Sequence, residues 1–193
     1  SSFLVIVEDG EAPFFPNLGT TMTFLSNSDS CEGTATWPTP QAADFCSPAS
    51  TVTVTSSHES GSVFAIGDHS IVFTATDSSG NQHAQIVTVT IVDNEVPTIT
   101  EIPVDMVGTA TLGECGVVMF WNPPTVTDCT ETTLSSNYES GAQIPVGLNT
   151  IVYTALDSAG NSSQVSFFIN VGDAEAPTIE GMPASVVLTN DFD

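Results

Sequence analysis

The sequence feature that most constrains the fold is an internal repeat. The motif Asp-x-Glu-x-Pro begins at Asp9, again 84 residues later at Asp93, and a third time at Asp173. The same offset of 84 joins Cys31 to Cys115 and Trp37 to Trp121, and after one shortened loop the offset stays at 80 through Asp77/Asp157 and Asn81/Asn161. A register that holds on both sides of a single shortening indicates two units that descend from one, so we predict a tandem array.

The Asp-x-Glu-x-Pro motif also sets the predicted boundaries. Residues 9–92 and 93–172 are two complete repeats, and residues 173–193 are the first strands of a following one. Residues 1–8 are predicted to be the last strand of a preceding repeat, because their Phe-Leu-Val-Ile-Val run matches the Val-rich ends of both complete repeats. We therefore expect the parent protein to continue in both directions.

Each unit carries strand signals and no helical periodicity. Residues 51–56, 70–77, 86–92 and 150–157 alternate with period two or are rich in β-branched residues, and Gly-Asn turns follow 70–77 and 150–157. About seven short strands in one unit are typical of an immunoglobulin-like sandwich. The sequence thus predicts an all-β chain of tandem immunoglobulin-like (fibronectin III-like) β-sandwich domains, with Trp37 and Trp121 packed in the two cores.

These residues resemble a known module. The order runs from the Asp-x-Glu-x-Pro motif through Cys115, Trp121 and Asp128-Cys129 to an Ile-Pro-Val-Gly turn at 144–147 and Ile-Val-Tyr-Thr-Ala-Leu-Asp-Ser-Ala-Gly-Asn at 151–161. It is similar to the hyalin repeat (HYR), over essentially the whole chain. The resemblance implies an extracellular, secreted or cell-surface location. Family members often carry a further cysteine pair, but Ile102 and the residues near Gln164 occupy those positions, so one disulfide per repeat is expected.

The charge balance limits the partners. There are 23 acidic residues and no Lys or Arg, which gives a formal net charge of −23. Nothing in such a chain can displace phosphate counterions, so nucleic acid is excluded. Protein salt bridges are excluded as well, which leaves metal cations as the means of neutralising clustered carboxylates. No apolar run reaches the roughly 18 residues that a membrane helix needs.

The acids recur at places that a sandwich gathers at one end. In this topology the linker, the B–C turn and the F–G turn meet at one pole. We predict calcium ligands there, because Ca²⁺ takes six to eight oxygens; the alternative is that these residues simply favour turns and a solvated linker. The predicted ligands are Asp9, Glu11, Asp44, Asp77 and Asn81 in repeat 1, Asp93, Glu95, Asp128, Asp157 and Asn161 in repeat 2, and Asp173 and Glu175 in the third motif.

Four cysteines in matched spacings indicate two disulfides in an oxidising compartment. The recurring spacing favours Cys31–Cys46 and Cys115–Cys129 within each repeat. That pairing requires residues 122–128 to run back along the strand that follows Cys115, and it would then draw Asp128 away from the calcium pole. A disulfide between neighbouring domains is the alternative.

Together these features predict a structural or adhesive extracellular array, a calcium-stiffened rod or filament component that contacts neighbouring repeats and self-associates into fibres. The alternative is a ligand-binding module for carbohydrate or protein within a larger secreted or surface protein. No Ser/His/Asp order or phosphate loop recurs in the repeats. We therefore expect no enzymatic activity.

Overall fold

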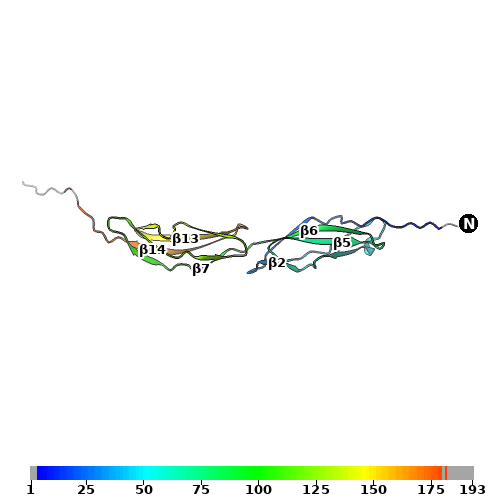
Figure 1. Ribbon diagram of the computed structural model, residues 1–193, viewed down its shortest axis with the longest axis horizontal. Coiled ribbons are helices and arrows are strands. Elements are labelled where there is room, and N and C mark those ends of the chain that lie inside the picture. The colour runs from blue at the N-terminus through cyan, green and yellow to red at the C-terminus, as the bar shows by residue number, and fades with distance from the viewer. Residues whose placement is uncertain (1–3, 180, 182–193) are drawn as a thin grey trace, which may run out of the picture. The chain divides into compact units, whose positions relative to one another are not determined.

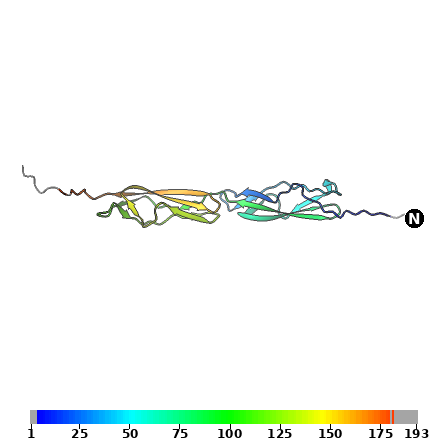
Figure 2. The same ribbon diagram turned by 90° about the horizontal axis from the view of Figure 1, so that it is seen from above.

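A computed structural model describes residues 4–179 and 181. The chain is all-β and forms two β-sandwich domains, with a single turn of 3-10 helix, η1 (Ala49–Thr51), among the described residues (Figures 1 and 2). Alternation of β-branched and small polar residues explains the strands, because it gives each one an apolar and a polar face.

The first domain is built around one long hairpin. β5 (Gly67–Thr76) and β6 (Gln82–Val92) pair antiparallel, and β1 (Thr21–Leu25) joins β6 in parallel. β3 (Thr53–Ser56) completes the sheet in the order β1-β6-β5-β3. The facing layer is the pair of β2 (Glu32–Ala35) and β4 (Ser62–Ala65), and Phe14 and Ala43 add an isolated bridge.

The second domain repeats this plan. β13 (Gly147–Asp157) and β14 (Ser162–Gly172) form the long hairpin, within a sheet of order β11-β13-β14-β8. β8 (Met106–Thr109) pairs in parallel with β14, as β1 does with β6. The remaining strands are β11 (Thr132–Ser136) in that sheet, the pair β9 (Gly116–Val118) and β12 (Gln143–Pro145), and the pair β7 (Thr98–Thr100) and β10 (Thr125–Thr127).

Each domain has its own core. Every second residue is buried over 71–75 of β5 and 87–91 of β6 in the first domain, and over 151–157 of β13 and 167–171 of β14 in the second. The prediction that Trp37 and Trp121 pack in the cores is confirmed, since both are buried. Trp37 meets Phe73 edge-on with ring centroids 6.0 Å apart, and the Trp121 Nε1–H donates to the Tyr153 hydroxyl at 2.7 Å.

The ends of the chain differ from the expected strands. Residues 4–8 form no strand, and Leu4, Val5, Ile6 and Val7 are exposed. Residues 173–179 and 181 also form none, and the rest of the predicted third repeat lies outside the described residues. By compactness the chain divides into a first unit (Ser1–Ile99, Val126–Leu134 and Ala155–Ser163) and a second unit (Thr100–Thr125, Ser135–Thr154 and Gln164–Asp193). The repeat boundaries at 8/9, 92/93 and 172/173 remain predictions.

Candidate metal centres and cysteine pairs

The hairpin turn that follows β5 and β13 gathers donors around one aspartate. The Asp77 carboxylate accepts from the backbone N–H groups of Ser79 (2.9 Å) and Asn81 (2.8 Å) and from Asn81 Nδ2 (2.8 Å). Asp157 accepts in the same way from Gly160 N, Asn161 N and Asn161 Nδ2. The Asp-x-x-Gly-Asn sequence therefore builds the same turn twice.

The asparagine of each turn also holds the linker. Asn81 Nδ2 donates to the Asp9 carbonyl at 3.1 Å, and Asn161 Nδ2 donates to the Asp93 carbonyl at 3.2 Å. The Asp9 carboxylate is oriented by the backbone N–H of Glu11 at 3.1 Å. The first residue of the first two Asp-x-Glu-x-Pro motifs is thereby tied to the turn between the two longest strands of its domain.

A third aspartate completes each cluster. Carboxylate oxygens of three aspartates lie within 4.8 Å of one another in each repeat. We call these clusters the first acidic triad (Asp9, Asp44, Asp77) and the second acidic triad (Asp93, Asp128, Asp157). Asp128 stays with Asp93 and Asp157, so the displacement that the sequence left open does not occur. The second triad is the more enclosed of the two, with Asp93 and Asp157 buried and Asp128 half-buried.

Two influences act on the pKa of the turn aspartates. Burial is the largest single one and raises the pKa of Asp77, but the hydrogen bonds from the Asn81 side chain and from the Asn81, Ser79 and Gly80 backbone together outweigh it. The net pKa lies below its ordinary value, and that of Asp157 is lowered for the same reasons. These carboxylates are therefore charged at neutral pH, in a chain without Lys or Arg.

One oxygen in the first triad has no partner. Asp44 Oδ1 accepts from the N–H groups of Cys46 (2.8 Å) and Ser47 (2.6 Å). Its Oδ2 is buried and receives no hydrogen bond from the described part of the chain. A buried carboxylate oxygen without a partner, on a side chain that clusters with two further carboxylates, fits a bound cation, because a cation can compensate its charge.

The other predicted ligands do not contribute carboxylates to either triad. Glu11 and Glu95 contribute backbone N–H groups to Asp9 and Asp93, not carboxylates to a triad. Asn81 and Asn161 act as donors. Asp173 accepts from Glu175 N, and Glu175 Oε2 accepts from Gly113 N at 3.0 Å, so the third motif contacts a loop of the second repeat. Ligation by any of these residues remains a prediction.

The cysteines pair differently from the expectation. Cys31 is bonded to Cys129, with an S–S distance of 2.08 Å and a Cα–Cα distance of 5.1 Å. Cys46 and Cys115 are exposed and unpaired within the described residues. The predicted pairs Cys31–Cys46 and Cys115–Cys129 are therefore wrong in this structure.

The reason for the difference is strand direction. Cys31 directly precedes β2, and the chain continues through Trp37 to the Ala43 bridge before it reaches Cys46. The Cys31 carbonyl accepts from Ile66 N, just before β5 begins, whereas Ser47, next to Cys46, contacts Ser78 just after β5 ends. The two cysteines of one repeat thus lie at opposite ends of the sandwich. Aspartates also surround Cys46, and its thiol pKa is raised first by Asp9, then by burial and by Glu11 and Asp44.

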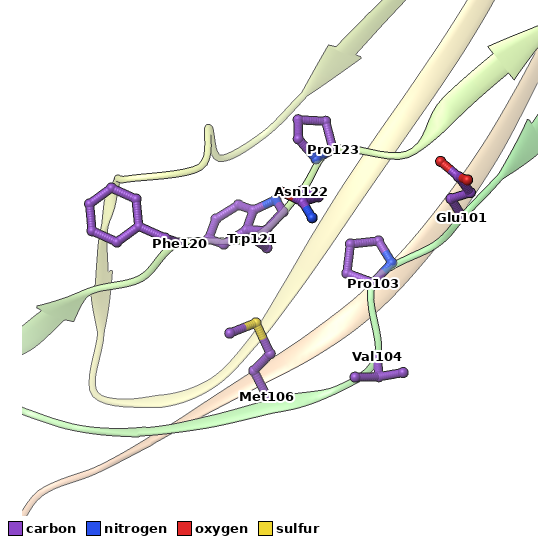
Figure 3. Close-up of a pocket in the computed structure, with 8 residues that line it drawn as sticks. All are labelled: Glu101, Pro103, Val104, Met106, Phe120, Trp121, Asn122 and Pro123. Carbon is purple, nitrogen blue, oxygen red and sulfur yellow. The ribbon is translucent and has the colours of Figure 1, made fainter.

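A shallow hollow of about 560 Å³ lies elsewhere in the second repeat (Figure 3). Its walls are the segment from Glu101 to Met106 and the segment from Phe120 to Pro123. Phe120 is 73% exposed and lies between β9 and β10. The first repeat has a hollow at the matching place, lined by Leu18, Met22 and Pro38. The hollow is therefore a feature of the repeat.

The fold and these sites define a class: tandem β-sandwich modules with an acidic cluster in each repeat and a disulfide that joins the two. The HYR domain model matches residues 22–91 and 92–171, so the chain belongs to the HYR domain family. No helix among the described residues is long and apolar enough to cross a membrane.

Three relatives match most of this chain. The chain is 30% identical over 155 residues to hyalin of Lytechinus variegatus, a match that covers 78% of this chain and 29% of the relative. It is 32% identical over 153 residues to hyalin of Strongylocentrotus purpuratus, covering 77% and 13%. A mouse protein with sushi, von Willebrand factor type A, EGF and pentraxin domains is 30% identical over 160 residues, covering 80% and 4%. The chain thus spans less than a third of these relatives.

Solved structures give a more distant likeness. Drosophila N-cadherin EC1-4 aligns with a TM-score of 0.46 at 13% identity, covering 84% of this chain and 50% of that chain. Mouse cadherin-23 EC22-24 aligns with a TM-score of 0.46 at 16% identity, covering 83% and 66%. Both scores are too low to add to the assignment, which rests on the family match and the strands themselves.

Proposed function

We propose that these HYR domains form an extracellular structural or adhesive array in which Ca²⁺ binds at the acidic triads and stiffens the chain. The observation that carries the proposal is the convergence of three carboxylates in each repeat of a chain that has no Lys or Arg. The Cys31–Cys129 disulfide supports the location, since such bonds persist in oxidising compartments.

Calcium fits the donors better than other common ions. The triads offer only oxygen, which excludes the thiolate and imidazole ligands that zinc favours. Three charged carboxylates also repel one another unless a cation lies between them. Ca²⁺ accepts irregular sets of six to eight oxygens, so carbonyl groups and water can complete its shell.

The stiffening follows from where the ligands come from. In the first triad Asp9 belongs to the linker, Asp44 to the loop before Cys46 and Asp77 to the hairpin turn. An ion held by all three would fix the linker against two segments of the sandwich at once. Without it, the hydrogen bonds that tie Asp9 to the rest of the sandwich are those from Asn81 and Ser47.

The test is thermal unfolding with millimolar CaCl₂ and with EDTA. A cation that binds only the folded state stabilises it by about 2.7 kcal/mol at 100 times its dissociation constant, and so raises the midpoint. Asp44→Asn keeps the oxygen that accepts from Cys46 and Ser47 but removes the charge on the unpartnered oxygen. We expect this variant to unfold at or above the wild-type midpoint in EDTA and to lose much of the calcium-induced shift.

Glu139→Gln is the matched control, because Glu139 is exposed and belongs to neither triad. It should respond to calcium like the wild type. Equal wild-type midpoints in calcium and in EDTA would remove the calcium part of the proposal and leave the structural array.

Self-association is a second part of the proposal. Val5 and Val7 are 69% and 89% exposed, whereas their counterparts at the end of the first repeat, Val89 and Ile91, are buried in β6. A strand with this pattern is suited to complete the sheet of another copy. We expect sedimentation velocity to show concentration-dependent association that Val5→Asn/Val7→Asn weakens. Leu4→Asn/Ile6→Asn is the control, since those positions correspond to the polar Thr88 and Thr90. A single monomeric species at every concentration would count against it.

The alternative role, carbohydrate or protein binding, has one observation in its favour: the exposed Phe120 beside the hollow of Figure 3. A stacking platform of this kind would lose its ligand on Phe120→Ala. Binding to a glycan array that disappears in this variant would favour the alternative over the structural role.

A further inference from the structure

We propose that Cys46 and Cys115 are half-sites of further disulfides of the Cys31–Cys129 kind, so that each repeat is covalently bonded to the repeat before it and to the repeat after it. The partner is a HYR repeat of the same type: for Cys115 the repeat that begins at Asp173, and for Cys46 the repeat that would precede Asp9. This inference rests on the proposed array, but not on calcium.

The first step is that each repeat holds two kinds of cysteine. Cys31 and Cys115 are one kind. The Cys31 carbonyl accepts from Ile66 N at 3.1 Å, and the Cys115 carbonyl accepts from Val146 N at 3.0 Å. Each is followed at once by a short strand, β2 or β9. The backbone therefore presents both sulfurs from the same place in the sandwich.

Cys46 and Cys129 are the other kind. The Asp44 carboxylate accepts from the backbone N–H of Cys46 at 2.8 Å, and the Asp128 carboxylate accepts from that of Cys129 at 2.6 Å. The next residue in each case reaches the linker: Ser47 Oγ donates to Asp9 at 3.3 Å and Thr130 Oγ1 donates to Asp93 at 3.1 Å. Both cysteines thus sit beside an acidic triad.

The bond in the structure joins one cysteine of each kind. Cys31 is the first kind and comes from repeat 1, while Cys129 is the second kind and comes from repeat 2. If this bond recurs along the array, Cys46 bonds to the preceding repeat and Cys115 bonds to the following repeat. In a repeat that begins at Asp173, the second kind of cysteine falls 36 residues further on, as Cys129 does after Asp93, at a position that the 193-residue sequence does not reach.

The surroundings of Cys115 resemble those of the Cys31–Cys129 bond, except that one part is missing. Beside the existing bond, a hollow of about 300 Å³ is lined by the loop residues Asp29 and Ser30, by the linker from Glu95 and by the wall Thr127–Cys129. Beside Cys115, a hollow of about 530 Å³ is lined by the matching loop residues Gly113 and Glu114 and by the matching linker from Glu175. The wall that carries the second cysteine is the part without a counterpart there.

Exposed apolar side chains flank both half-sites. Phe45, next to Cys46, is 78% exposed and stacks on Phe14 with centroids 5.3 Å apart. Leu112 and Val146, near Cys115, are also exposed, whereas Ile66, the counterpart of Val146 beside the existing bond, is half-buried. Apolar surface at each half-site is what a docked neighbour would cover.

The bond needs an oxidant. Two thiols lose two protons and two electrons as the S–S bond forms, and a disulfide of the glutathione or dithiol-protein class takes them up and becomes two thiols. The Cys31–Cys129 bond requires the same oxidant, so the proposal adds no new chemistry.

The experiment duplicates residues 9–172 in tandem, giving a chain of residues 1–172 followed by 9–193, so that the second Asp9 stands where Asp173 stood. The chain is refolded in oxidised and reduced glutathione, alkylated and weighed, then cleaved at acidic residues because it has no Lys or Arg for trypsin. We expect two alkylated thiols and a peptide in which Cys115 is bonded to Cys46; the Cys46→Ser variant of the second copy then assigns this bond to Cys115 of the first copy and Cys46 of the second.

Every other outcome overturns the inference. Four alkylated thiols would mean that the half-sites do not pair, and none would mean pairing within repeats. A Cys46→Ser change in the second copy is the control and should leave Cys115 of the first copy alkylated. The calcium shift measured on the same chain separates the two proposals: a bond without a calcium shift refutes only calcium, and a calcium shift without the bond refutes only this inference.

Discussion

Tyr153 and Phe73 occupy the same place in the two repeats and differ by a single hydroxyl. In the second repeat the hydroxyl accepts from Trp121 Nε1–H at 2.7 Å, and both groups are buried. In the first repeat Trp37 has only the edge-on contact with Phe73, beside a small hollow of about 120 Å³. One residue therefore decides whether the core tryptophan has a hydrogen-bond partner.

This difference makes a reciprocal prediction. Tyr153→Phe leaves the Trp121 N–H unpaired and should cost about 1–2 kcal/mol, whereas Phe73→Tyr supplies a partner for Trp37 and should add about 1 kcal/mol. Urea unfolding, followed separately for each tryptophan in variants with the other replaced by Phe, measures both. Changes of the same sign in the two repeats would contradict the prediction.

At the residue scale, the sequence located the triad aspartates but not the cysteine pairs. The aspartates were predictable because turn chemistry at Asp77 and Asp157 and the linker motif at Asp9 and Asp93 are local patterns. The pairing of Cys31 was not, because a similar spacing in both repeats, 15 and 14 residues, does not reveal that the two cysteines lie at opposite ends of a sandwich.

The two long hairpins are the elements that position the acidic triads. Their strands were predictable from strict period-two alternation, which β5 and β13 both show. Shorter pairs such as β7 with β10 were not predicted, since three residues carry too little pattern. The expected strand at residues 3–7 is not formed over its described part. Its counterparts β6 and β14 each pair with the hairpin strand that precedes them, and residues 4–7 have no such strand before them.

The turn of the second hairpin depends on its glycine. Gly160 has φ +98°, a conformation that L side chains rarely adopt, although nothing lies within 4 Å of where its Cβ would be. Gly160→Ala should therefore cost about 1–2 kcal/mol through backbone strain alone. Because this turn holds Asp157, the calcium-induced shift should also shrink. Differential scanning calorimetry with and without calcium measures both effects.

Gly10→Ala is the matched control, because its Cβ would be equally free of neighbours but the backbone there is not in the left-handed region. Its free energy of unfolding should stay within about 0.5 kcal/mol of the wild-type value. Equal costs at the two positions would show that the turn conformation does not matter.

At the scale of the molecule, the disulfide is the only covalent link between the two repeats besides the chain itself among the described residues. It closes a loop with a sequence separation of 98 residues and so ties the start of β2 to the loop that carries Asp128. Asp128 belongs to the second acidic triad, so the covalent link and the candidate ion site share one segment. Loss of either should loosen the same part of the chain.

The size of the covalent contribution can be predicted from the loop. In the chain-entropy model a closed loop of about 100 residues stabilises the folded state by about 4.7 kcal/mol at 25 °C, because it restricts the unfolded chain. Cys31→Ser/Cys129→Ser should therefore lower the thermal midpoint by on the order of 10 °C in EDTA. Cys46→Ser/Cys115→Ser removes as many sulfur atoms from exposed, unpaired positions and should leave the midpoint unchanged. Equal midpoints for the two double variants would mean that the disulfide stabilises neither domain. A lower midpoint for Cys31→Ser/Cys129→Ser alone would show that joining the repeats also stabilises them.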